Sequence, residues 1–151
     1  MKEVANEQAV IRFLGYRLVN VNYVCSPDFE LNTITNGKYH FSFTKVGALL
    51  SDTQYQLNLI VRLCYSNEAD YESAPLRLVI ELAGRYECEE SWSDRWEANA
   101  LAILFPYLRA MVSTVTAQSG REPVVLPTVN IVQLFKNAAE NKEKMQKHLS
   151  E

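Results

Sequence analysis

Few side chains in this sequence of 151 residues stand in patterns that do acid–base, nucleophilic or metal chemistry. The two histidines are far apart, His40 in an alternating segment and His148 in a charged carboxy-terminal stretch. We interpret His40 as a strand residue and His148 as a cation at a helix end, because neither has a catalytic partner nearby in the pattern. The motifs GxSxG, HExxH, GxGxxG and the phosphate-binding loop do not occur. The sequence therefore predicts no catalytic residue and no enzyme activity.

An acidic run is the strongest candidate for a cation site or for paired catalytic carboxylates. It comprises Glu87, Glu89, Glu90, Asp94 and Glu97. Carboxylates this close in sequence, with Arg85 and Arg95 beside them, are more typical of a solvated loop, and they lack the spacing of an EF-hand. The cysteines, Cys25, Cys64 and Cys88, have no CxxC or CxxH spacing, so they do not predict a zinc site. We expect neither a metal nor a cofactor.

Charge and the amino-terminal sequence exclude several classes of partner. The net charge is −3 and no basic stripe is visible, so we expect no nucleic acid partner. The first eight residues, MKEVANEQ, lack the order of a signal peptide. The longest apolar stretch, 98–108, is too short to cross a bilayer, and scattered thiols of odd number are typical of a reducing compartment. We expect a soluble cytoplasmic protein without membrane insertion, with residues 1–151 in one domain.

Alternating apolar and polar residues predict four strands between about residues 11 and 88. The clearest alternation covers 54–65, and similar patterns occur at 76–86, at 39–43 and within 11–24. The breaks between these segments are short and contain turn-forming residues. Parallel neighbours require long crossovers, so the pattern predicts an antiparallel meander.

The hydrophobic period changes to that of a helix in the last third of the chain. Apolar residues at spacings of three and four predict a helix over about 94–119, ended by Gly120, with a kink or restart at Pro106. A second helix is predicted over 130–148, apolar on one face at first and polar beyond Ala139. Strands followed by helices indicate an α+β fold, a four-stranded antiparallel sheet with both helices on one side.

The segment between the two predicted helices, REPVVLPTV at 121–129, is apolar although its prolines exclude a helix. Two interpretations are open: Val124, Val125 and Leu126 cover a corner of the core, or they line a groove. Eight tyrosines, six phenylalanines and two tryptophans supply more apolar surface than such a sheet needs. This surplus predicts oligomer contacts, a groove for a client polypeptide, or both. The small residues Ala110, Ser113 and Ala117 are predicted to lie at an oligomer interface or against the sheet of the same chain.

Two motifs in the helical part resemble the SecB family of bacterial protein-export chaperones. Residues 103–109, ILFPYLR, resemble the ILFPYAR segment that opens the long helix of that family, and 126–131, LPTVNI, followed by Leu134 and Phe135, is similar to its LAPVNFxxLF segment. With the four preceding strands, the resemblance covers about residues 11–137. The two helical motifs are specific as a pair, whereas the strands match only in pattern.

The resemblance implies an ATP-independent holdase that assembles as a dimer of dimers and binds unfolded or extended clients, including preproteins, in apolar grooves. Such grooves bind without sequence specificity, because burial of apolar surface is non-directional. On this view the client-binding residues lie at or near the groove. They are Phe105, Tyr107, Val124, Val125, Leu126, Val129, Leu134 and Phe135.

The sequence departs from the export chaperone where that family docks the motor ATPase SecA. The corresponding positions are Asn20, Val24 and Val79, none of which is acidic. The carboxy terminus contains several lysines in place of an acidic tail. These differences argue against SecA as a partner and favour SecB-like chaperones outside the main export pathway, including those that protect an antitoxin of a toxin–antitoxin system.

Two alternatives from other classes remain open at this stage. A small-ligand-binding domain or enzyme would require an enclosed polar pocket with converging titratable groups. A purely structural oligomer predicts that the double substitution Val124→Asp, Val125→Asp disturbs assembly, whereas a holdase would lose client binding and largely keep its assembly.

Overall fold

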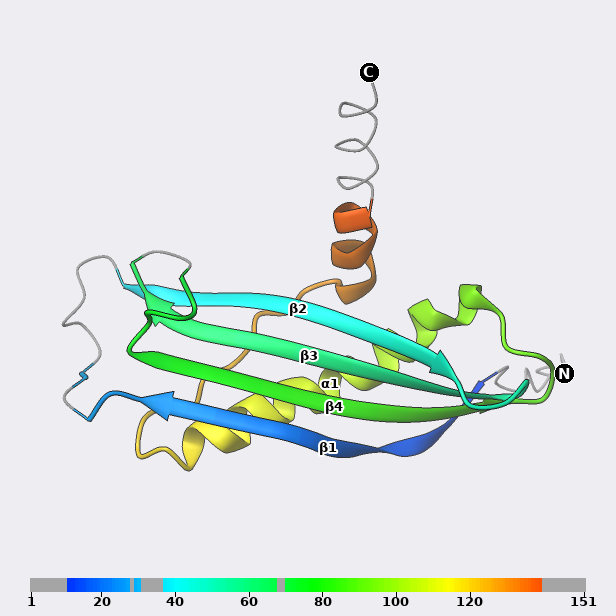
Figure 1. Ribbon diagram of the computed structural model, residues 1–151, viewed down its shortest axis with the longest axis horizontal. Coiled ribbons are helices and arrows are strands. Elements are labelled where there is room, and N and C mark those ends of the chain that lie inside the picture. Colours follow the sequence, from blue (N-terminus) through cyan, green and yellow to red (C-terminus); the bar gives the residue numbers. More distant parts are fainter. Residues whose placement is uncertain (1–10, 28, 31–36, 68–69, 140–151) are drawn as a thin grey trace, which may run out of the picture.

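Four long strands form one open, twisted antiparallel sheet in the computed structural model (Figure 1). They are β1 (Ile11–Cys25), β2 (Lys38–Leu49), β3 (Gln54–Ser66) and β4 (Leu76–Cys88). The structure describes residues 11–27, 29–30, 37–67 and 70–139. All four predicted strands are confirmed, and each lies within a few residues of its expected position.

The order of the strands is β1-β4-β3-β2, so the meander covers β2, β3 and β4 only. The prediction of a meander through all four strands is corrected at β1, which pairs antiparallel with β4 at the opposite edge from β2. The links on either side of β3 are short enough for hairpins, whereas the link between β1 and β2 spans residues 26–37. A link of that length can cross the end of the sheet, and a break in hydrophobic pattern does not reveal which edge it reaches.

The core lies between the inner face of the sheet and the long helix α1 (Glu97–Ala117), which follows the short η1 (Asp94–Trp96). Every second residue of β3 points to this face, and Leu57, Leu59, Val61 and Leu63 are all fully buried. From α1, Leu104, Leu108 and Val112 cover them, at the helical spacing that the sequence predicts. The predicted α+β fold is confirmed.

Pro106 lies within α1 without ending it, where the sequence predicts a kink or a restart. A proline removes the hydrogen bond to the carbonyl of the residue four positions earlier, here Ala102. Both residues are exposed, so water can satisfy that carbonyl and the helix continues. Past α1, Gly120 takes a positive φ of 82° in the turn that ends the helix, as expected.

By length and mean hydropathy alone, the helical stretch Asp94–Ala117 could cross a membrane, with a mean hydropathy of 1.5 over its most apolar window. Its apolar side is the side that packs on β3 and β4 in the fold described here. The apolar composition of this helix therefore has an explanation within the protomer.

A second helical segment, residues 131–139, follows an extended connector, residues 121–130 (Figure 1). It lies at the β2 side of the sheet, where the Lys45 ammonium is 5.4 Å from the centre of the Phe135 ring. The predicted helix over 130–148 is confirmed up to residue 139, and its remainder, with His148, lies outside the described residues.

Candidate functional site

The connector alternates buried and exposed apolar side chains. Val124 and Leu126 are buried, at 7% and 0% exposure, whereas the Val125 side chain between them is 67% exposed. An extended backbone turns successive side chains to opposite sides, so Val124 and Leu126 cover the core while Val125 faces outward. Val124 and Leu126 therefore cover the core, whereas the groove-lining role of Val125 stays a prediction.

Three polar side chains of α1 hold the backbone of the connector in place. Ser113 Oγ donates to the Val124 carbonyl at 3.0 Å, and the Val124 N–H donates to Thr116 Oγ1 at 2.8 Å. Arg109 Nε donates to the Leu126 carbonyl at 3.3 Å. The connector lacks strand partners among the described elements, so these bonds satisfy backbone groups that would otherwise be buried unpaired.

The two aromatic residues beside Pro106 lie on different sides of α1. Phe105 is buried and meets Phe43 of β2 edge-on, with ring centres 5.7 Å apart. Tyr107 is 41% exposed and lies against Tyr16 of β1, with ring centres 4.9 Å apart. The structure therefore separates these two predicted client-binding residues, placing Phe105 toward β2 and Tyr107 toward β1.

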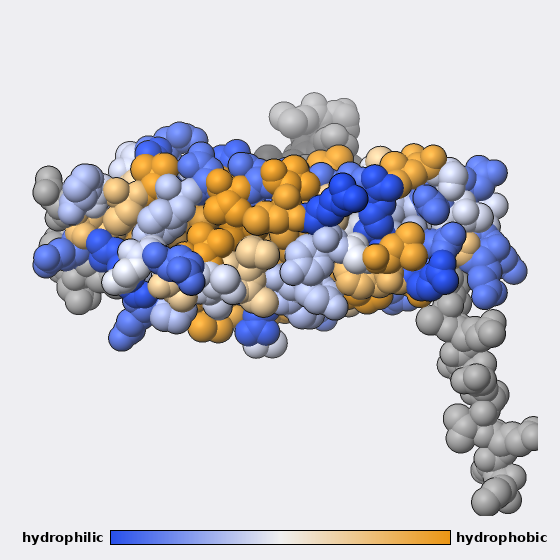
Figure 2. Space-filling model, turned by 90° about the horizontal axis from the view of Figure 1, so that it is seen from below, coloured by the Kyte–Doolittle hydropathy of each residue, from blue (hydrophilic) through white to orange (hydrophobic). Residues whose placement is uncertain are grey.

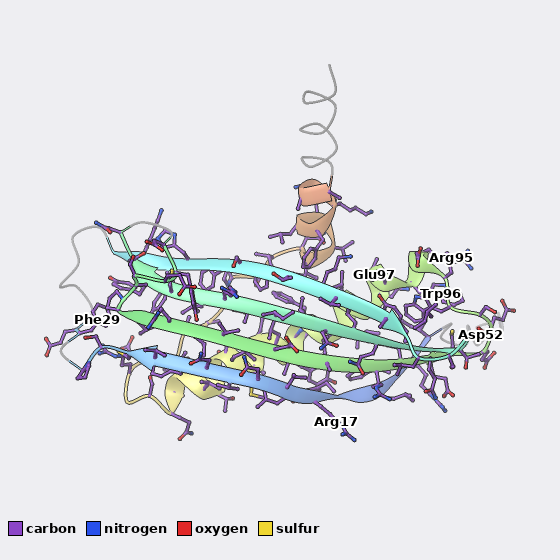
Figure 3. All side chains as sticks on the ribbon, viewed as in Figure 1. Arg17, Phe29, Asp52, Arg95, Trp96 and Glu97 are labelled. Carbon is purple, nitrogen blue, oxygen red and sulfur yellow. The ribbon has the colours of Figure 1, made fainter. Side chains whose placement is uncertain are left out.

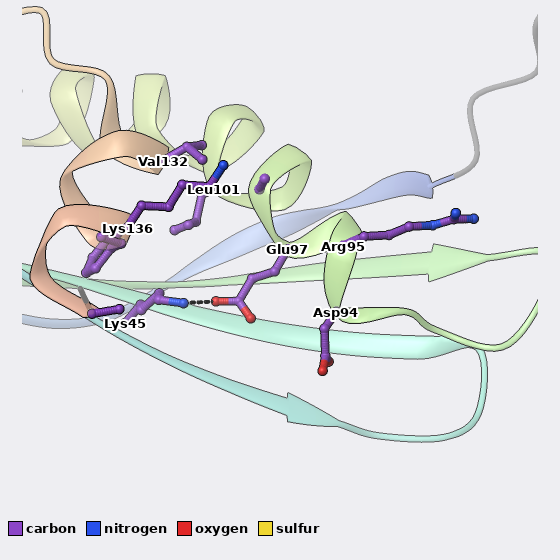
Figure 4. A pocket seen from close by; sticks show the side chains of 10 residues that line it. Lys45, Asp94, Arg95, Glu97, Leu101, Val132 and Lys136 are labelled. Atoms are coloured by element: carbon purple, nitrogen blue, oxygen red, sulfur yellow. Dashed lines mark hydrogen bonds and ion pairs between the residues drawn. The ribbon is translucent and has the colours of Figure 1, made fainter. Parts of the chain in front are cut away.

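Residues 131–139 are flanked by two hollows that we call the β2 groove. One hollow, of about 450 Å³, lies between this segment and the start of α1 (Figure 4). The other, of about 370 Å³, lies between the segment and β2. Their apolar walls include Phe43, Leu101, Val132, Leu134 and Phe135. Leu134 and Phe135, both predicted client-binding residues, therefore lie together at this groove, with Val129 half-buried shortly before them.

Charged side chains stand at the rim of the β2 groove and tie its walls together. Lys45 Nζ forms an ion pair with the Glu97 carboxylate, joining β2 to α1 (Figure 4). Tyr55 donates its hydroxyl to Glu97 Oε2 at 3.3 Å. Burial, together with the neighbouring Glu97 carboxylate, raises the pKa of Tyr55 to about 12. Glu97 therefore links β2, β3 and α1 at this rim through Lys45 and Tyr55.

Gly47 makes room for this arrangement. A Cβ atom at Gly47 would overlap the Tyr55 hydroxyl, so any side chain there would displace the ring or the hydroxyl.

Across the described part of the chain, no three His, Cys, Asp or Glu side chains gather as metal ligands. The β2 groove thus presents apolar walls beside a charged rim.

β1 carries exposed apolar side chains on both faces of the sheet, which the expectations did not include. Its exposed apolar side chains are Leu14, Tyr16, Leu18, Val19, Val21 and Val24. Figure 2 looks toward this side of the molecule, where apolar residues gather across the middle. The signal was available in the sequence, because β1 carries adjacent apolar residues at 18 and 19 that a strand cannot bury on one face.

Three small residues of α1, Ala110, Ser113 and Ala117, differ in their exposure. Ala110 and Ala117 are exposed, whereas Ser113 is half-buried and bonded to the connector.

The positions that correspond to the SecA-docking residues are Asn20, Val24 and Val79. All three lie on the outer face of the sheet, away from α1, because they pair with Glu81, Arg77 and Asn22.

Comparisons with known proteins agree with this geometry. Residues 47–142 match the family described as preprotein translocase subunit SecB. An uncharacterized protein of Methanocaldococcus jannaschii, MJ0357, is 36% identical over 88 residues, 56% of this chain and 57% of that protein. This chain thus matches little more than half of the length of that curated relative.

A solved structure has the same fold. It is the SecB-like chaperone Rv1957 of Mycobacterium tuberculosis in complex with a ChAD peptide from the Rv1956 HigA1 antitoxin. Its TM-score is 0.60 at 15% identity, and the match covers 79% of this chain and 90% of that one. The family match extends over more than half of the sequence, from the end of β2 past the second helical segment. The chain belongs to the SecB family.

Proposed function

We propose that this protein is a chaperone that holds unfolded or extended polypeptides without nucleotide, keeping them competent for export or assembly. The observation that carries the proposal is the β2 groove, with its apolar walls and its partly exposed Leu134. Val125, exposed on the connector, adds an apolar contact outside that groove.

The physical chemistry of the groove suits this role. Burial of apolar surface contributes about 25 cal/mol per Å² whatever the order of the residues buried, so it favours many client segments alike. The ion pair between Lys45 and Glu97 holds the wall where β2 meets α1. A client can therefore bind without a large rearrangement of that wall.

A dedicated client is the finer form of the proposal. The structural relative Rv1957 was solved with a peptide of an antitoxin, and an antitoxin segment is the client class that we propose here. SecA is a weaker candidate partner, because Asn20, Val24 and Val79 on the outer face provide no carboxylate. Measurable SecA affinity that falls at moderate salt would favour general export instead.

We also propose that the protein is a cytoplasmic homo-oligomer, a dimer of dimers. The exposed apolar residues of β1 offer one contact surface, and the exposed Ala110 and Ala117 of α1 offer another. Large apolar surfaces on a protomer favour burial against a partner chain. Several grooves on one assembly would raise the effective concentration of binding sites along one client.

The test is suppression of aggregation of a refolding client in the absence of nucleotide. Leu134→Asp places a charge in the β2 groove and should raise the amount of protein needed about tenfold, since a burial of this kind is worth about 1.4 kcal/mol or more. Val46→Asp is the matched control, because Val46 is 59% exposed on the outer face of β2. Failure of the unaltered protein to suppress aggregation at several-fold excess would contradict the proposal.

A further inference from the structure

The outer face of the sheet carries a charge opposite to that of the whole chain. Strand register places on this face the cationic residues Arg12, Arg17, Lys38, Arg62, Arg77 and Arg85. Among the described strand residues, the carboxylates on the same face are Glu81 and Glu87. The chain as a whole has a net charge of −3, so cationic side chains are concentrated here.

Both carboxylates of this face already have partners. Glu87 forms an ion pair with Arg12 across β1 and β4. Glu81 accepts a hydrogen bond from the Asn58 amide at 3.1 Å. Within the described part of the chain, Arg17 and Arg85 have no carboxylate within ion-pair distance, and Arg85 instead donates from Nε to Gln56 at 3.0 Å.

Arg17 and Arg85 stand beside a hollow of about 370 Å³ near the β1 edge of this face. Gly15 lies directly opposite Arg85, and Arg17 lies opposite Ala83, so the two arginines are diagonal neighbours, about 7–8 Å apart at their bases. Figure 3 shows Arg17 projecting away from β1. Leu14, Tyr16 and Gln54 complete the walls of the hollow.

A β-bulge creates this space. The register of β1 against β4 shifts between Phe13 and Gly15, and Gly15 takes a φ of 124°, which other residues rarely adopt. A Cβ atom at Gly15 would meet nothing within 4 Å, so open space lies above the backbone there. The bulge thus lies beside the hollow that Arg17 and Arg85 line.

We propose that this hollow is a docking site for an acidic segment of a partner protein, with an Asp or Glu side chain between Arg17 and Arg85. A guanidinium matches a carboxylate with two parallel hydrogen bonds, and Leu14, 47% exposed, offers apolar contact to a neighbouring residue of the same segment. We call this the arginine hollow. It is separate from the β2 groove, on the opposite face and at the opposite edge of the sheet.

A polypeptide fits this site better than a nucleic acid does. The net negative charge of the chain opposes a long polyanion, whose affinity comes from many phosphate contacts. Glu81 and Glu87 interrupt the positive surface on β4, at positions where a continuous phosphate backbone would meet them. An acidic peptide can place one carboxylate in the hollow and direct its other residues elsewhere.

The experiment measures binding of fluorescein-labelled octaglutamate to the full chain by fluorescence anisotropy at low salt. The double variant Arg17→Gln, Arg85→Gln should weaken binding at least about tenfold, as loss of a charge-assisted pair predicts. The double variant Lys38→Gln, Arg62→Gln is the matched control, because it removes two exposed cations from the same face outside the hollow and should change affinity by less than about threefold. Arg17→Lys, Arg85→Lys should lie between, since charge remains without the two-pronged geometry.

Equal losses in the Lys38→Gln, Arg62→Gln control and in the Arg17→Gln, Arg85→Gln variant would overturn the proposal, since the attraction would then be general to the face. Stronger, arginine-dependent binding of a thymidine octanucleotide would overturn the assignment to a polypeptide. A change in assembly mass of the Arg17→Gln, Arg85→Gln variant by light scattering, with peptide binding unchanged, would make the hollow a contact between copies and would also contradict it. Retained thermal unfolding of each variant, followed by the emission of Trp92 and Trp96, excludes loss of the fold as the cause.

Discussion

β3 and β1 are both long and rich in apolar residues, yet they differ in how much of their apolar side chains is buried. β3 lies between β4 and β2, and four of its apolar side chains have no exposed surface. β1 lies at an edge and leaves Leu18 46% and Val19 53% exposed. The same residue types therefore hold the protomer together in one strand and remain available to a second chain in the other.

The difference comes from the neighbours of each strand and from its regularity. β3 alternates from Gln54 to Leu63, with its odd-numbered residues buried, and α1 covers its inner face. β1 has register shifts between Phe13 and Gly15 and between Leu18 and Asn20, which redirect side chains away from a single face. An irregular apolar edge is a poor contributor to a core and a favourable surface for association.

The largest effect should follow from truncation in β3. Leu59→Ala should lower the free energy of unfolding by about 2–5 kcal/mol, because it removes a fully buried side chain and leaves a cavity. Urea unfolding followed by the emission of the two tryptophans measures this loss. Leu18→Ala in β1 is the matched control and should cost about 1 kcal/mol or less in the separated protomer. Equal costs would remove the distinction between the two strands.

The connector allows the same contrast between adjacent residues. Val124→Asp should lower the free energy of unfolding by roughly 3 kcal/mol, since it buries a carboxylate beside Thr116 without a cationic partner. Val125→Asp should change it by less than about 0.5 kcal/mol, because the side chain faces outward. Thermal unfolding of the two variants checks the difference. A Val125→Asp variant as unstable as Val124→Asp would show that Val125 is packed.

Strand and helix positions were predictable because each has a hydrophobic period set by burial on one side. The alternation of residues 54–65 defines β3, and the spacing of Leu104, Leu108 and Val112 defines the inner side of α1. The edge on which β1 joins was not predictable, since the link at 26–37 carries no pairing signal. The hydrophobic pattern alone does not determine which edge of the sheet β1 occupies.

The candidate site was predictable only in part, and for a similar reason. Leu134 and Phe135 meet at the β2 groove as the motif implies. Phe105 is sealed in the core and Tyr107 faces β1, because neighbours along a helix point to different sides. The ion pair between Lys45 and Glu97 joins residues far apart in sequence, which only the folded chain brings together.

Tyr55, buried and bonded to Glu97 at the rim of the β2 groove, should make stability depend on alkaline pH. Its pKa is raised from 10.0 to about 12, so the folded state favours the protonated phenol. The raised pKa contributes roughly 2 kcal/mol to the free energy of unfolding. This contribution is complete below pH 10 and is lost as the pH rises toward 12. Unfolding by urea at several pH values should show a fall over this range that is smaller in Tyr55→Phe. An identical pH profile in the variant would contradict the assignment.

Substitutions in β1 should have the smallest effect on the protomer and a clear effect on assembly. Val19→Lys, Val24→Lys should change protomer stability by less than about 1 kcal/mol, because both residues are exposed. The assembly mass measured by light scattering should fall to that of a smaller species, since the lysines would be desolvated in a contact between copies. Val46→Lys on β2 is the control and should leave the mass unchanged. An unchanged mass in the β1 variant would contradict a role of β1 in assembly.

The most direct test of the chaperone role is calorimetric titration of the protein with a permanently unfolded polypeptide, reduced and carboxymethylated lactalbumin, without nucleotide. The account predicts saturable binding with a negative heat capacity change, weakened about tenfold by Leu134→Asp and unchanged by Val46→Asp. Absence of binding, or equal binding by the Leu134→Asp variant, would contradict the claim that the β2 groove holds non-native chains.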